Sequence, residues 1–369
     1  MPRVLFLASD LGASAPATFL TTLIPTLGTE FTFAVVDLDG KATPGVLDLL
    51  QAHGVPVWSA PMRSWADVRG LREVRRCLAA FAPDVLHTLG GTATAAGGLF
   101  TLPGLRLPAS VRRVVSGADR ADASAGWLIR RFCRSAVALA PTHAESERYR
   151  VAGIVCRDMI VVPPAVVPAS ALPEAAEFRR SLGLPAESRL IFAAGRFDST
   201  AALKSAVWAF DVVKYVAADI YLVLVGDGPE RERLARFAQA LGFDDHRVRF
   251  LGLRDDLPAL LNLAELVWVT HEQGGVPIAL EAMAAGKPVV AQRTPDLAEI
   301  VQHGVTGILT TVGDKVQLAA AANGFLEDPI KAQAFGDAGR RRAAEVFSIV
   351  PHAKRVALVY HGLASVASE

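Results

Sequence analysis

The alternation of short apolar runs with amphipathic stretches constrains the fold of this 369-residue chain more than any other feature. Runs rich in Val, Leu and Ile that alternate with helical stretches are typical of parallel strands joined by crossover helices. Helices then cover both faces of such a sheet. We expect strands at 4–8, 33–37, 84–90, 112–116, 136–140 and 159–163 in the first half, and at 190–195, 221–226, 248–252, 266–270, 288–291 and 307–310 in the second.

A proline-rich segment at 163–185 separates the two sets of predicted strands and indicates an inter-domain connection. We therefore predict an α/β protein of two Rossmann-like doubly wound parallel-sheet domains, residues 1–168 and 186–344, facing across a cleft. Ligands of such domains bind beyond the carboxyl ends of the strands. Residues 333–366 are typical of one or two helices, with Pro351 marking a break.

Composition argues against several classes of protein. Hydrophobic residues make up 51% and charged residues 20%, which suits a compact chain rather than a long disordered one. The net charge of +1 argues against a nucleic-acid partner. The three cysteines lack metal-ligand spacing, which favours a reducing compartment. With no signal peptide and no apolar run of membrane-spanning length, we expect a cytoplasmic protein.

The polar segment at 271–291 predicts a nucleotide site. Gly274 and Gly275 allow the backbone to approach a ligand, and the helix that follows offers unpaired N–H groups to an anion. Glu281, about one turn into this helix, can accept hydrogen bonds from the two hydroxyls of a ribose. The alternative is a glutamate that only interacts with the helix dipole of an ordinary α/β unit.

A second polar segment, residues 193–204, predicts a site for a diphosphate. A strand ends at Gly195, Arg196 follows in the loop, and Lys204 falls on the next helix. A guanidinium and an ammonium together can neutralise the charge that develops on a departing nucleoside diphosphate. An Arg and a Lys on an ordinary exposed surface are the alternative.

Together these segments resemble the signature of the retaining family 4 glycosyltransferases, which have the GT-B fold. That signature is a Glu, seven residues, a second Glu, then AlaMetAla and GlyxProValVal. Glu281 is the second Glu, whereas Gln273 stands at the first position and the carboxylate of Glu272 is displaced by one. Residues 224–234 and 298–309 match further blocks of the family.

The resemblance implies transfer of a sugar from a nucleotide sugar, a UDP- or GDP-sugar, to a carbohydrate or lipid-linked acceptor, with retention and without a metal or other cofactor. It also implies that a C-terminal helix, residues 345–369, packs back on the first domain, which would bind the acceptor. The residues it assigns are Arg196, Lys204 and Gln273 for catalysis; Gly12, Gly195, Phe250, Gly274, Gly275, Glu281 and Glu299 for the donor; and His87 and Ser116 on the acceptor side.

Departures from the family pattern keep a second function open. Gln273 replaces a Glu, Ser116 stands where many members have a His, and only Gly12 remains of the paired glycines in the loop at 10–18. A protein of the same fold without turnover would bind a nucleotide or nucleotide sugar as a sensor or partner. A nucleotide-sugar epimerase is a third hypothesis, although its acid and base residues have no candidates here.

Other polar residues also have two interpretations. His87, at a strand end, faces the cleft or is a structural histidine, and Glu299 faces the donor or caps a turn. The segment 127–134 contacts a membrane face or is a half-buried helix with solvated arginines. Asp37 and Asp39 form the single AspxAsp pair, away from the expected donor site, so we expect no metal dependence.

Overall fold

The chain folds into two compact units. The structure, a computed structural model, describes residues 1–12, 15–102, 107–108, 110–117, 126–166, 174–198, 202–216, 219–243, 247–254, 256–272 and 274–365. The first unit comprises Met1–Ala165 together with Ile349–Glu369, and the second comprises Val166–Ser348.

The sheet of the first unit is parallel throughout the described strands and has the order β3-β2-β1-β4-β5-β6-β7. The order reverses between β1 and β4, so the loops that follow these strands diverge to opposite sides and leave a crevice at the carboxyl edge. The strands are β1 (Arg3–Ala8), β2 (Thr32–Asp37), β3 (Val57–Ser59), β4 (Val85–Leu89), β5 (Arg112–Ser116), β6 (Ala136–Ala140) and β7 (Asp158–Val161).

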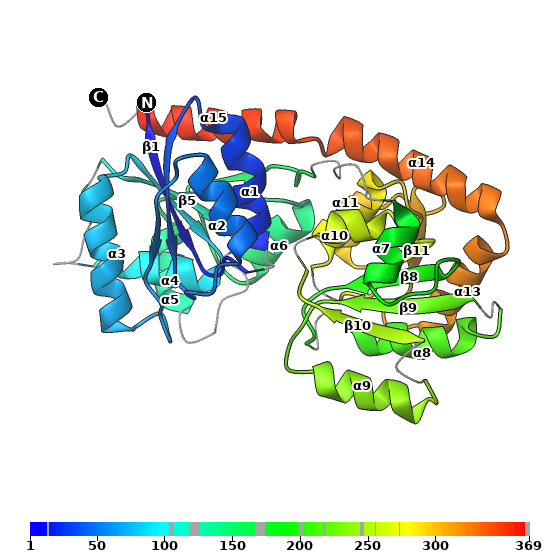
Figure 1. Cartoon of the computed structure of the whole chain (residues 1–369). Helices are drawn as coiled ribbons and strands as arrows, with labels where there is room; N and C mark the ends of the chain where they lie inside the picture. Colours follow the sequence, from blue (N-terminus) through cyan, green and yellow to red (C-terminus); the bar gives the residue numbers. More distant parts are fainter. Residues whose placement is uncertain are drawn as a thin grey trace. The chain divides into compact units, whose positions relative to one another are not determined.

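Helices cover both faces of this sheet. On one face α1, α2 and α15 pack against Phe6, Val35 and Leu89, and Figure 1 shows α1 beside α15. On the other face α3, α4, α5 and α6 cover Leu7, Val36 and their neighbours. The helices are α1 (Ala15–Leu27), α2 (Pro44–Ala52), α3 (Val68–Phe81), α4 (Gly91–Leu99), α5 (Gly126–Cys133), α6 (His143–Val151) and α15 (Ile349–Ser365).

The second unit repeats the architecture with a parallel sheet of order β10-β9-β8-β11-β12-β13. Here the order reverses between β8 and β11, which places the crevice at the ends of these two strands. The strands are β8 (Arg189–Ala194), β9 (Ile220–Val225), β10 (Val248–Gly252), β11 (Leu266–Val269), β12 (Val289–Gln292) and β13 (Gly307–Thr310).

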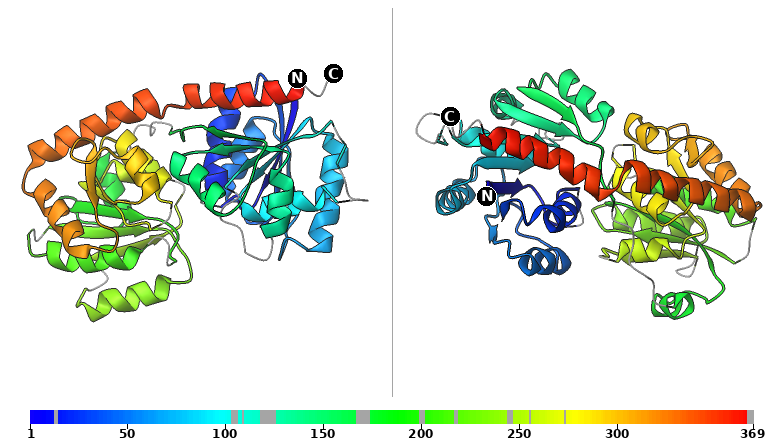
Figure 2. Two further views of the ribbon diagram at one scale, coloured as in Figure 1. Left: turned by 180° about the vertical axis from the view of Figure 1, so that it is seen from behind. Right: turned by 90° about the horizontal axis from the view of Figure 1, so that it is seen from above.

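Two apolar clusters pack on the faces of this second sheet. One joins α7, α10, α11, α12 and α14 to Phe192 and Val267, and the other joins α8, α9 and α13 to Trp268 and Leu222. Figure 2 shows the same layers from two further sides. The helices are α7 (Ala175–Ser181), α8 (Leu203–Val213), α9 (Arg231–Ala240), α10 (Leu257–Leu261), α11 (Val276–Ala284), α12 (Pro295–Ile300), α13 (Lys315–Leu326) and α14 (Pro329–Val346).

The predicted fold class, two Rossmann-like parallel-sheet domains, is confirmed. One strand, β3, has no counterpart in the prediction because it is only three residues long and is not fully buried. The predicted break at Pro351 is wrong in position: α14 ends at Val346, and Pro351 lies in the first turn of α15. A proline fits there because the first N–H groups of a helix have no partner within it.

Candidate functional site

Glycines bring the loops after β8 and β9 into close contact. A Cβ on Gly226 would lie 1.9 Å from the carbonyl oxygen of Gly195, and one on Gly228 would lie 2.6 Å from that of Phe197. The backbone N–H of Phe197 donates to Asp227 O at 2.9 Å. Only glycine fits at Gly226, where φ is +134°. The loop that carries the predicted diphosphate residues is therefore fixed by its neighbour.

Of the two predicted diphosphate cations, one is available to a ligand and the other has an aromatic contact. Arg196 is 74% exposed, and its Nε lies 3.6 Å from Asp198 Oδ2. Such an exposed ion pair is weak and a phosphate can replace it. The Nζ of Lys204 lies 4.6 Å from the ring centroid of Phe237 on α9. The Lys204 ammonium therefore lies near that ring, whereas the Arg196 guanidinium is exposed in the loop.

The loop before α11 has the conformation that its two glycines predict. Gly274 and Gly275 have φ of +80° and +79°, a region that other residues rarely adopt. A Cβ on Gly275 would lie 2.9 Å from both His271 and Val269. Gly275 is the N-cap of α11, and a glycine has no side chain that could accept from the first N–H groups. This helix end can therefore offer backbone N–H groups to an anion.

Glu281 lies on α11 and is half-buried, with one of its two carboxyl oxygens removed from water. Its Oε2 is buried and has no hydrogen-bond partner among the described residues. Burial raises the pKa of this carboxyl to about 7, because desolvation disfavours the charged form. A buried acceptor without a partner costs about 1–3 kcal/mol, which a ligand with hydroxyl donors would recover.

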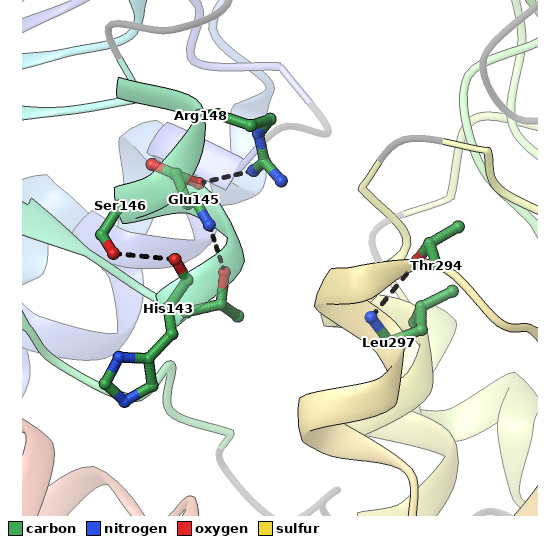
Figure 3. Close-up of polar contacts among 7 residues, drawn as sticks. His143, Glu145, Ser146, Arg148, Thr294 and Leu297 are labelled. Carbon is green, nitrogen blue, oxygen red and sulfur yellow. Dashed lines mark hydrogen bonds and ion pairs between the residues drawn. The ribbon is translucent and has the colours of Figure 1, made fainter. Parts of the chain in front are cut away.

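Phe250 and Glu299 lie on other elements of the second unit. Phe250, on β10, packs edge-on against Phe197 at 6.1 Å between ring centroids, where β10 departs from regular register. Glu299 lies in the last turn of α12. The N-cap of this helix is Thr294, whose side chain accepts from Leu297 N at 3.3 Å (Figure 3).

Of the remaining predicted site residues, Gly12 is among the described residues and Gln273 is not. Gln273 lies outside the described residues, as do residues 13 and 14 of the predicted phosphate loop. Gly12 is described, and its N–H donates to the side chain of Asp10 at 2.6 Å. A Cβ on Gly12 would lie 3.1 Å from that carboxylate. This glycine therefore closes a local turn after β1.

His87 and Ser116, predicted on the acceptor side, contact each other in the first unit. Both project from the same face of the sheet, His87 within β4 and Ser116 at the end of β5. His87 Nε2 lies 3.0 Å from Ser116 Oγ. His87 is completely buried, whereas Ser116 is half-buried. The ring of His87 therefore belongs to the core, and Ser116 separates it from the end of the strand.

Other polar groups of the first unit support local structure. The described residues contain no group of three or more His, Cys, Asp or Glu placed to hold a metal ion. Helix α5 buries Leu128 and Phe132 but leaves Trp127 half exposed. On α6, Glu145 N donates to the side chain of Thr142 at 3.0 Å (Figure 3). Among the described helices, none is both long and apolar enough to cross a membrane.

Solved structures with the same architecture place the fold in a class. HepE from Anabaena, in complex with UDP-glucose, superposes with a TM-score of 0.84 at 21% identity, covering 98% of this chain and 100% of that one. Sucrose-phosphate synthase from Thermosynechococcus elongatus gives a TM-score of 0.80 at 18% identity, covering 99% and 100%. The two Rossmann-like units therefore form a GT-B fold.

Sequence comparison relates the second unit to one family. Residues 174–342 match the model of the glycosyl transferases group 1. The N-acetyl-alpha-D-glucosaminyl L-malate synthase of Bacillus anthracis is 30% identical over 172 residues, 46% of this chain and 45% of the relative. The MMP alpha-(1->4)-mannosyltransferase of Mycolicibacterium hassiacum is 35% identical over 161 residues, 43% and 38%. The match thus spans less than half of these two relatives.

Proposed function

We propose that this protein is a glycosyltransferase that moves a sugar from a nucleoside-diphosphate sugar to an acceptor bound by the first unit, with retention at the anomeric carbon. The observation that carries the proposal is the buried carboxyl of Glu281, whose Oε2 lacks a partner in the described part of the chain. Two adjacent ribose hydroxyls are donors of the kind that this acceptor lacks.

The surroundings of Glu281 suit the rest of a nucleotide. The uncapped N-terminus of α11 offers N–H groups and a positive dipole end to phosphate oxygens. Arg196, after β8, supplies an exposed cation that follows the other strand at which the sheet order reverses. In a transfer reaction these groups stabilise the negative charge on the departing diphosphate, which is the role of a preorganised electrostatic site.

The chemical step needs no further protein nucleophile in the route that we favour. The departing phosphate accepts the proton of the acceptor hydroxyl while that oxygen bonds to the anomeric carbon from the same face. HepE has been solved with UDP and glucose and with UDP-glucose, which favours a UDP-sugar as the donor. One relative is named for lipopolysaccharide core biosynthesis and another as a 2-deoxystreptamine glucosyltransferase, and we expect a carbohydrate or lipid-linked acceptor at a cytoplasmic site.

The proposal is tested by incubating the full chain with UDP-, GDP- and ADP-glucose and measuring the nucleoside diphosphate released. We expect release from one of them, and NMR of the product sugar should show the α configuration of the donor. Glu281→Ala should weaken binding of the matching nucleotide by about 1.5–3 kcal/mol, whereas exposed Glu232→Ala on α9 should leave it unchanged.

Two results would argue against a transferase. Nucleotide binding without turnover in a screen of donors and acceptors would favour the second hypothesis. In that case the protein is a binding protein of the same fold, in which Gln273 has replaced a catalytic carboxylate. An amide can bind a sugar hydroxyl, but it carries no charge to stabilise a cationic anomeric centre. Product with inverted configuration would contradict the retaining route.

A further inference from the structure

Three residues that are distant in the sequence form a hydrogen-bonded chain in the first unit. The hydroxyl of Tyr360, on the C-terminal helix α15, lies 2.6 Å from His87 Nδ1 on β4. On the other side of the ring, His87 Nε2 lies 3.0 Å from Ser116 Oγ at the end of β5. These hydrogen bonds therefore link the apolar core to the carboxyl edge of the sheet.

Both inner members of this chain are uncharged. Tyr360 and His87 are completely buried, and the rings of Phe6 and Phe19 lie 5.4 and 5.5 Å from the imidazole centroid. Burial lowers the pKa of His87 to about 3 and raises that of Tyr360 well above its ordinary value of 10. The histidine is then a neutral imidazole, with one N–H and one acceptor nitrogen, across the physiological range.

The buried hydroxyl of Tyr360 decides which nitrogen carries the proton. If His87 Nδ1 carried it, the Tyr360 hydroxyl proton would have no acceptor in the described surroundings, at the cost of an unsatisfied buried donor. If Nε2 carries it, Tyr360 donates to Nδ1 and Nε2–H donates to Ser116 Oγ. Every buried donor is then satisfied, and the Ser116 O–H is left to point away from the ring.

We propose that Tyr360 and His87 are positioning residues that hold the Ser116 hydroxyl as a hydrogen-bond donor toward an oxygen atom of the sugar substrate. Ser116 suits this role because it is half-buried at the strand end, where its hydroxyl contacts His87. Its backbone is fixed as well, since Gly90 N donates to Ser116 O at 2.8 Å. The choice of a sugar as ligand rests on the proposed transferase function.

The hydrogen-bonded chain from Tyr360 through His87 to Ser116, here called the relay, can be tested without substrate. In the full chain labelled with 15N-histidine, the signals of His87 are those that shift in both Tyr360→Phe and Ser116→Ala, and long-range 15N–1H correlations report the protonation of each nitrogen. We expect a protonated Nε2, an unprotonated Nδ1 and no titration between about pH 5 and about pH 8. A proton on Nδ1, or an imidazolium near neutral pH, would overturn the relay.

The substrate contact is tested by kinetics with whichever of UDP-, GDP- and ADP-glucose the wild-type chain hydrolyses. Ser116→Ala and Tyr360→Phe should each lower kcat/KM about 3- to 10-fold with unchanged Kd for the nucleoside diphosphate, while Ser116→Thr keeps the activity. Tyr149→Phe, at another completely buried tyrosine of this unit, is the matched control and should keep it too.

The outcomes separate the relay from the proposed function. Unchanged kcat/KM in folded Ser116→Ala would overturn the substrate contact, and equal losses in Tyr360→Phe and Tyr149→Phe would reduce Tyr360 to a packing residue. A wild-type chain that turns over no sugar nucleotide, alone or in a screen of acceptors, would overturn the proposed function and the substrate contact together. The NMR result would still decide the relay in that case.

Discussion

Replacing Glu281 by Gln should stabilise the ligand-free protein at high pH. Burial raises the folded-state pKa of this carboxyl to about 7, whereas in an unfolded chain it lies at its ordinary value of 4.5. The folded state thus retains a proton that the unfolded state has lost, so the contribution of Glu281 to stability falls as pH rises from about 4.5 to about 7. A glutamine carries no charge and removes this dependence.

The magnitude follows from the two pKa values. A difference of about 2.5 pKa units at about 1.36 kcal/mol each gives a penalty of about 3 kcal/mol above pH 7. At about pH 5 only about 1 kcal/mol of this has developed, because that pH lies only about half a unit above the unfolded-state pKa of 4.5. The stability difference between Glu281→Gln and wild type should therefore become more favourable to the variant by about 2 kcal/mol between about pH 5 and about pH 8.

Urea unfolding followed by circular dichroism at these two pH values measures the difference. Glu232→Gln is the matched control, because Glu232 is exposed on α9 of the same unit. With saturating nucleoside diphosphate at high pH, wild type should become more stable than Glu281→Gln. The carboxylate then has hydroxyl partners that the amide binds less well. An equal stability difference at both pH values would refute the assigned burial of this carboxyl.

Four further outcomes follow from the second unit. Gly226→Ala should cost more than 3 kcal/mol of stability because its Cβ would overlap Gly195 O. Gly242→Ala, whose Cβ would meet no atom within 4 Å, should cost about 1 kcal/mol. Thermal unfolding of the two variants compares these costs. Thr294→Ala should cost about 1 kcal/mol in the same assay through the lost cap of α12. Arg196→Ala should lower kcat for sugar-nucleotide hydrolysis at least tenfold while the secondary-structure spectrum stays unchanged. Calorimetric affinity for UDP should rise through about pH 7 in wild type but less in Glu281→Gln, because ribose hydroxyls favour the ionised carboxyl.

Strands buried on both faces can be predicted from the sequence almost to the residue. The predicted run at 136–140 coincides with β6, and the run at 4–8 differs from β1 by one residue, since a continuous apolar run between polar turns has few other solutions. The edge strand β3 escapes this rule because its side chains are only partly buried. Parallel order in both sheets follows from the helical connections, which are too long for hairpins.

Parts of the candidate site that lie within one loop and helix can also be predicted. Gly275 and Glu281 are separated by less than two turns, so local geometry fixes their relation. Contacts between distant elements cannot be predicted in this way. Neither the position of Lys204 over Phe237 nor the hydrogen bond between Tyr360 and His87, 273 residues apart, leaves a pattern in the sequence, because both depend on how helices pack.

Calorimetric titration of the full chain with UDP, GDP and ADP tests the central claim, that the second unit binds a nucleoside diphosphate through the buried carboxyl on α11. We predict that one of the three binds with a single site, and that Glu281→Ala lowers its affinity at least tenfold. Absence of heat with all three nucleotides, or equal affinity in the variant, would contradict the account.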